Sequence, residues 1–78
     1  MKEDIYQRAL LLEKEGDWDG AHRLIQDLPT PEAAWVHAYL HRREGDDGNA
    51  MYWYNRAGKD FFEGSFQEEW SLLYESLS

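Results

Sequence analysis

Cysteine is absent from this 78-residue chain, and basic side chains are scarce. The lack of cysteine excludes a disulfide framework and any thiol chemistry. Only 8 lysine and arginine residues oppose 16 aspartate and glutamate residues, which gives a formal net charge of −8 at pH 7. Such an acidic surface repels the phosphate backbone of DNA and RNA, so we expect no nucleic-acid partner.

Long apolar runs are also missing. No segment approaches the roughly 20 apolar residues that a membrane-spanning helix needs. The first residues, Met1-Lys2-Glu3-Asp4, lack the apolar region of a secretory signal. We therefore expect no membrane association and a cytoplasmic location. The length suits one domain over residues 1–78, in which four Trp, five Tyr and three Phe partly compensate for the small core.

What the chain does contain is an internal repeat. The segment Glu15-Gly16-Asp17-Trp18-Asp19-Gly20-Ala21 returns 29 positions later as Glu44-Gly45-Asp46-Asp47-Gly48-Asn49-Ala50. In each copy, the first glycine suits the left-handed end of one helix, and the aspartate after it suits the cap of the next helix. The alanine allows two helices to approach closely. The repeat therefore predicts an antiparallel helical hairpin that occurs twice.

The spacing of apolar residues predicts an all-α fold of about five helices. Pro29-Thr30-Pro31 separates the two hairpins, because Thr30 can cap a helix whose first residue is Pro31. Ser65 and Glu68 form a capping box for a last helix. We expect hairpin one over about 3–28, hairpin two over about 31–57 and a C-terminal capping helix over about 65–77. This capping helix is expected to shield the exposed side of the helix before it.

The pattern resembles tetratricopeptide-type and Sel1-like helical repeats, whose hairpins share a Gly-Asp turn and a small-residue contact. Ala9 and Ala38, twelve positions before Ala21 and Ala50, match a further small residue of the tetratricopeptide pattern. Residues 52–58, Tyr-Trp-Tyr-Asn-Arg-Ala-Gly, resemble the end of a Sel1-like helix. The period of 29 residues is shorter than the usual tetratricopeptide unit of about 34. Residues 41–58 also resemble small bacterial proteins of unassigned function, which adds no activity.

The resemblance implies a peptide-binding groove lined by the first helix of each hairpin. The segment 31–44 is apolar on two opposite faces, so its helix is expected to lie between neighbours. Six candidate partner-binding residues carry the aromatic or arginine side chains that interfaces favour. They are Tyr6, Trp35, Tyr39, Arg42, Arg43 and Tyr52. Alternatively, Trp35 and Tyr39 belong to the core, the arginines complement the end of their helix, and Tyr52 packs under the last helix.

A second stripe of the same segment carries His37, His41 and Glu44 at positions i, i+4 and i+7. This spacing could place two imidazoles and a carboxylate around one metal ion. The zincin pattern is not met, because Ala38 stands where the catalytic glutamate would be. The alternative is that these histidines are hydrogen-bonded packing residues.

No set of residues in the sequence indicates catalysis. Ser65 is explained as a helix cap, and the glycines of the repeat mark helix boundaries rather than a phosphate-binding loop. We expect no enzymatic activity and no cofactor. The preferred prediction is a non-enzymatic protein-interaction module that binds a peptide or partner protein through the groove of segment 31–44, with self-association as a homodimer as one form. The alternative is a small-molecule or metal-binding protein that uses the stripe of His37, His41 and Glu44.

Overall fold

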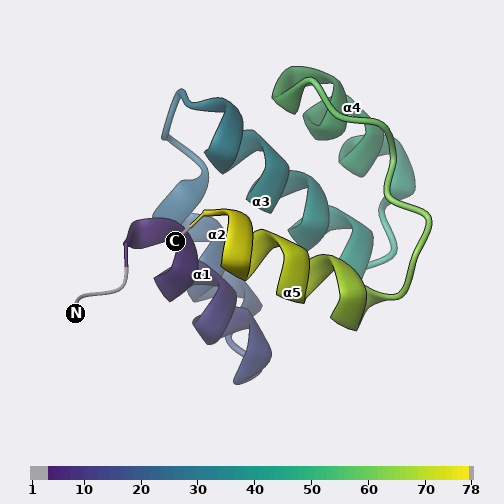
Figure 1. The fold of residues 1–78 in the computed structure, drawn as a ribbon. Coiled ribbons are helices and arrows are strands. Elements are labelled where there is room, and N and C mark those ends of the chain that lie inside the picture. The colour runs from purple at the N-terminus through teal and green to yellow at the C-terminus, as the bar shows by residue number, and fades with distance from the viewer. Residues whose placement is uncertain (1–3, 78) are drawn as a thin grey trace.

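The computed structural model describes residues 4–77 and contains five α-helices, with no strand in that range (Figure 1). The helices are α1 (Ile5–Lys14), α2 (Trp18–Ile25), α3 (Pro31–Arg43), α4 (Asp47–Ala57) and α5 (Phe66–Ser76). The predicted all-α class with about five helices is confirmed. The expected start of the first helix at Glu3 lies outside the described residues.

The two copies of the repeat form the same turn. Gly16 and Gly45 have φ angles of +96° and +86°, in the left-handed region that favours glycine. Asp17 and Asp46 then cap α2 and α4, accepting hydrogen bonds of 2.9 and 3.3 Å from the backbone N–H three residues later. Each aspartate N–H also donates to the carbonyl oxygen five residues earlier, at 2.8 and 2.9 Å. The repeated turn therefore ends one helix and starts the next by the same set of bonds.

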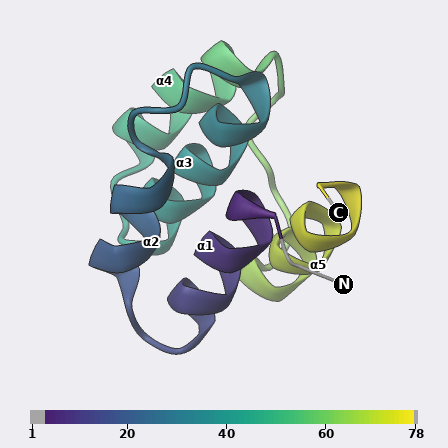
Figure 2. The same cartoon turned by 90° about the vertical axis from the view of Figure 1, so that its left-hand side faces the viewer.

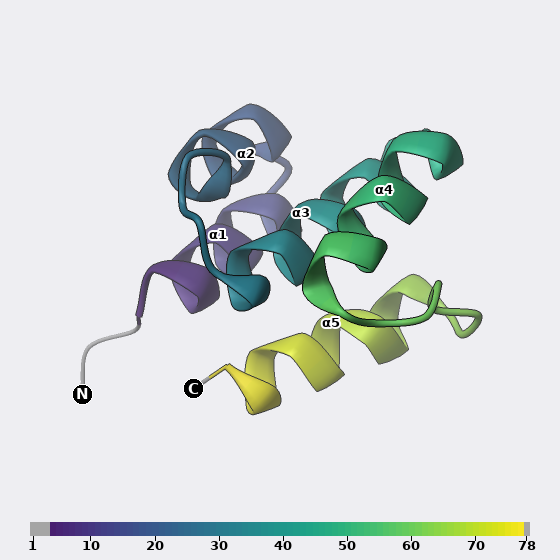
Figure 3. The same ribbon diagram turned by 90° about the horizontal axis from the view of Figure 1, so that it is seen from above.

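Helix α3 is the centre of the fold. Its nine consecutive residues from Ala33 to His41 are all buried. It contacts each of the other four helices. Helices α2 and α4 lie on the side of α3 away from α5 (Figure 3). The predicted burial of this helix on two opposite faces is therefore confirmed, and it gives the molecule two separate surfaces where α3 meets its neighbours.

The prediction that the last helix shields α4 is wrong. Helix α5 packs across α1 and α3 instead, and α1 lies between α2 and α5 in Figure 2. The Trp70 indole N–H donates to the carbonyl oxygen of Leu10 at 2.9 Å, and Leu73 is fully buried. Residues 58–65, which form no helix, carry the chain from α4 to this position. The physical reason is that α5 carries the partners for buried polar groups of α3, described below.

Helix α2 is shorter than predicted, because it ends at Ile25 and not near Leu28. The Leu28 N–H still donates to the carbonyl oxygen of Ile25 at 3.2 Å, in a turn that leads to Pro29. The longest helix has 13 residues. Within residues 4–77, no helix combines the length and apolar character that crossing a bilayer requires.

Candidate metal centre

Two of the predicted partner-binding residues, Trp35 and Tyr39, are core residues. Their side chains are 7% and 2% exposed. The Trp35 indole N–H donates to Glu69 at 3.2 Å, and the Tyr39 hydroxyl donates to Glu13 at 3.0 Å. Burial, followed by the negative charge of Glu13, raises the pKa of Tyr39. The polar atoms of both side chains are thus already paired inside the molecule.

The buried carboxylate of Glu69 explains why α5 fills the predicted groove. This side chain is fully buried and accepts hydrogen bonds from Trp35, from the Tyr54 hydroxyl at 2.5 Å and from Arg42 at 2.9 Å. Arg42 also donates to the carbonyl oxygen of Gly64. Burial and the bond to Glu69 raise the pKa of Tyr54. The face of α1 and α3 that was expected to hold a peptide therefore holds the chain's own last helix.

The other three predicted contact residues lie in different places. Arg43 is ion-paired with the nearly buried Glu13 at 3.0 Å. The Tyr6 hydroxyl is hydrogen-bonded to Thr30 at 2.8 Å, where α1 meets the start of α3. Tyr52 lies on α4, is 52% exposed and accepts a hydrogen bond from Arg56. Of the six residues, Tyr52 is thus the one whose ring is most open to a partner.

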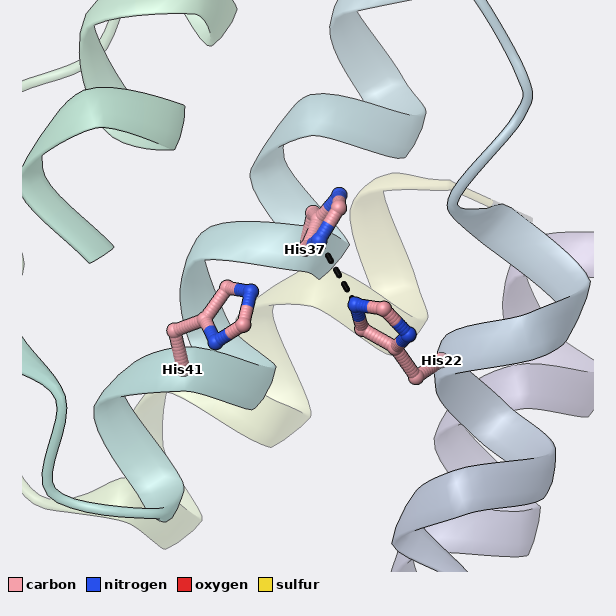
Figure 4. A group of neighbouring side chains, drawn as sticks. All are labelled: His22, His37 and His41. Carbon is pink, nitrogen blue, oxygen red and sulfur yellow. Dashed lines mark hydrogen bonds between the residues drawn. The ribbon is translucent and has the colours of Figure 1, made fainter. Parts of the chain in front are cut away.

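On the opposite face of α3, the structure brings together the three histidines of the chain. His37 and His41 lie one turn apart on α3, and His22 reaches them from α2 (Figure 4). The Nε2 atoms of His22 and His37 are 2.9 Å apart, and one ring nitrogen from each of the three lies within 4.8 Å of the others. Figure 4 shows a nitrogen of His41 directed toward the other two rings. Three imidazoles from two helices thus converge on one point.

Glu44 has a different position from the one predicted. It was expected to be the third ligand, but its carboxylate is hydrogen-bonded at 2.7 Å to Nδ1 of His41, behind the ring. Asp46 is close to this pair and caps α4. The third imidazole comes from His22, which the sequence prediction missed. A signal was present, because His22 directly follows Ala21, the small residue at which α2 packs closely on its neighbours.

Two tryptophans hold the imidazole rings in place. Trp53 of α4 stacks on His37 with ring centroids 3.8 Å apart, and Trp18 stacks on His22 at 4.9 Å. The Trp18 indole N–H donates to the carbonyl oxygen of Leu40 at 2.7 Å, which fixes that ring against α3. The rings of His37 and His22 are therefore packed between neighbours in the orientation that directs their Nε2 atoms toward each other.

The protonation states suit a ligand role. Burial, followed by the charges that His22 and His41 would carry, lowers the pKa of His37 to about 3. Burial also lowers the pKa of His22. These two rings are therefore neutral at pH 7, which is the form that binds metal ions. The Glu44 carboxylate accepts a hydrogen bond from Nδ1–H of His41, so Nε2 is the nitrogen of this ring that remains for a metal ion.

The arrangement matches the donor set of a metal ion with one open position. Three imidazoles bind Zn²⁺ in sites that keep a fourth place for water. All three residues come from helices rather than loops, and their orientation is supported by stacked rings and a carboxylate. Comparisons with protein-family models, with curated proteins and with solved structures found no match to this chain.

Proposed function

We propose that this protein binds one divalent transition-metal ion, with Zn²⁺ as the first candidate, through the Nε2 atoms of His22, His37 and His41. The observation that supports this is the convergence of three ring nitrogens, all within 4.8 Å of one another, on a nearly buried face of α3. Imidazole ligands suit Zn²⁺, Cu²⁺ and Ni²⁺, whereas Mg²⁺ and Ca²⁺ prefer oxygen. Water would complete the coordination at the open position.

The distances require only a small adjustment of the rings. With Zn–N bonds of about 2.0 to 2.1 Å, tetrahedral geometry places the ligand nitrogens about 3.4 Å apart. The pair His22 and His37 is hydrogen-bonded at 2.9 Å and would have to separate slightly, while His41 would have to move inward. One of the two bonded Nε2 atoms now carries a proton, which must pass to its own Nδ1 when the metal binds.

Calorimetry with ZnCl₂ at pH 7.5 tests the proposal on the full chain. We expect one site per chain with a micromolar or lower dissociation constant, which His37→Ala abolishes while the helical circular dichroism remains. Because Trp53 and Trp18 stack on the ligands, their fluorescence gives an independent signal. The same titration in 8 M urea is the control, because the unfolded chain carries the same three imidazoles without holding them close together. Equal affinity in the folded and unfolded chain, or no heat at micromolar zinc, would refute the proposal.

The repeat supplies a matched pair of variants for the carboxylate behind His41. Glu44→Gln removes the charge that holds the Nδ1 proton, and loss of such a partner weakens metal affinity by about 10- to 100-fold. Glu15 occupies the equivalent place in the first copy of the repeat, where no histidine lies beside it in sequence. Glu15→Gln is therefore expected to leave zinc affinity unchanged. Equal effects of the two changes would mean that Glu44 acts through net charge alone.

A second candidate function is protein interaction, favoured by the exposed aromatic side of α4. Met51 and Tyr52 are 45% and 52% exposed, and helix α5 does not cover them. A cytoplasmic interaction module of the tetratricopeptide-like kind would then use this side, with a second copy of the chain as the occupant, and not the groove that α5 fills. Light scattering over a concentration series tests this. A dimer that Tyr52→Ser dissociates without loss of thermal stability supports it, and a chain that stays monomeric refutes it.

A further inference from the structure

A hollow of ligand size lies on the face of α3 opposite the three histidines. It has a volume of about 380 Å³, is open to solvent on one side, and is lined by the last turns of α1 and α3 and the first turns of α5. Ligand pockets in proteins usually have volumes of about 300 to 1,000 Å³. Its walls include three aromatic side chains, those of Tyr39, Phe66 and Trp70.

Two cations face this hollow in a chain whose net charge is −8. The Lys14 ammonium lies 4.6 Å from the centre of the Trp70 ring, and Lys14 forms no ion pair within residues 4–77. The Arg43 guanidinium lies 4.9 Å from the Phe66 ring and gives only its Nε–H to Glu13. Within residues 4–77, its terminal N–H groups donate to no other side chain or carbonyl.

The single carboxylate in the lining is already neutralised. Both oxygens of Glu13 are occupied, one by the Tyr39 hydroxyl at 3.0 Å and the other by Arg43 at 3.0 Å. Lys14 therefore leaves a surplus of one positive charge around the hollow. A second hollow of about 360 Å³ offers a contrast, because its cation, Lys59, shares the lining with the exposed Glu32.

We propose that the hollow between α1, α3 and α5 binds a small organic anion with a flat apolar body, such as an aromatic carboxylate. The anionic group would pair with the Lys14 ammonium and the terminal N–H groups of Arg43. The apolar body would lie against the edges of Phe66 and Trp70, two side chains that are partly accessible here. This site is independent of the metal proposal, since it uses the other face of α3.

Titration of the ¹⁵N-labelled full chain with 3-phenylpropionate, followed by NMR, tests the inference. We expect shift changes centred on Lys14, Arg43, Phe66 and Trp70, with a dissociation constant in the millimolar range. The neutral analogue 3-phenylpropionamide should bind about tenfold more weakly, because it loses two partly exposed charge contacts. Acetate, which lacks the apolar body, should also bind more weakly. Equal binding of the amide, or no shift change at 10 mM, would overturn the proposal.

The chain offers a matched control for the lysine. Lys59 lies 4.2 Å from the centre of the Trp35 ring, in the same arrangement as Lys14 over Trp70, but at the other hollow. Lys14→Gln should weaken binding about threefold, the size expected for one exposed ion pair. Lys59→Gln should leave it unchanged. If both variants weaken binding equally, the ligand responds to net charge and the site is not this hollow.

Discussion

Replacing Glu69 by alanine is expected to cause one of the largest losses of stability in the molecule. The carboxylate is fully buried and accepts hydrogen bonds from Arg42, Trp35 and Tyr54. Glu69→Ala leaves the Arg42 guanidinium, whose side chain is only 11% exposed, without its counter-charge. Breaking a buried ion pair by removing one partner costs about 3 to 5 kcal/mol. The unpaired hydroxyl and indole N–H each add a further penalty, which is not additive with the first.

This loss is large compared with the stability of the whole chain. At about 0.05 to 0.15 kcal/mol per residue, 78 residues correspond to a free energy of unfolding of about 4 to 12 kcal/mol. Glu69→Ala should therefore leave the protein marginally folded. Glu69→Gln keeps an acceptor for Tyr54 and Trp35 while removing the charge, so its loss should be smaller.

Urea denaturation followed by circular dichroism measures these losses. The neighbouring Glu68 is the control, because its carboxylate is exposed and accepts a hydrogen bond from the Ser65 N–H at the start of α5. Glu68→Ala should reduce the free energy of unfolding far less than Glu69→Ala. The double variant Glu69→Leu with Arg42→Met should recover much of the stability, because no buried charge then remains unpaired. Equal losses for Glu68→Ala and Glu69→Ala would refute the view that the buried carboxylate holds α5 in place.

Two further predictions concern pH and the repeated turn. Burial raises the pKa of Tyr39 and Tyr54 above the ordinary value of 10.0, so above pH 10 the unfolded chain releases protons that the folded chain retains. The free energy of unfolding should then fall by about 1.4 kcal/mol per pH unit for each of these tyrosines. Urea titrations at pH 8 to 11 should show that this free energy falls less steeply with pH in Tyr54→Phe than in the wild type. Gly45→Ala forces an L side chain to φ +86° and should destabilise by about 1 to 2 kcal/mol. Gly48→Ala, in a helical and uncrowded place, should stabilise by about 0.5 to 1 kcal/mol, and thermal unfolding of both variants compares them.

The local architecture was predictable because its causes lie close together in the sequence. A glycine followed by an aspartate fixed two turns, Thr30 with Pro31 started α3, and Ser65 started α5. These signals depend on bonds between residues three to five positions apart. The placement of α5 was not predictable in this way, because it depends on Glu69 meeting Arg42, 27 positions away. A glutamate in a helix is usually exposed to solvent, so nothing in the sequence around Glu69 indicated that its side chain would be buried.

Two of the three histidines of the candidate metal centre were predicted, because only these two are close together in the sequence. His37 and His41 share a helix face, which their spacing of four residues shows directly. His22 lies 15 positions from His37 along the chain and meets it only through the packing of α2 on α3. Glu44 was predicted on the same stripe as His37 and His41, but a spacing rule cannot tell whether its carboxylate points toward the other rings or bonds to the far side of the His41 ring. In the structure, the Glu44 carboxylate is hydrogen-bonded to Nδ1 of His41.

The placement of α5 also changes which surfaces of α3 can have a function. One face of α3 meets α1 and α5, and its aromatic and arginine side chains are mostly paired within the chain. The other face meets α2 and α4, where three imidazole rings converge and burial lowers the pKa of two of them, His22 and His37. His22 and His37 stack on Trp18 and Trp53, and aliphatic side chains of similar volume would fill the same space without polar atoms that need partners. Histidine at all three positions is therefore better explained by a ligand that needs nitrogen lone pairs than by stability. Replacing His22 and His37 together by leucine should raise the free energy of unfolding in the absence of metal while abolishing zinc binding, and a loss of stability in that variant would favour the packing interpretation.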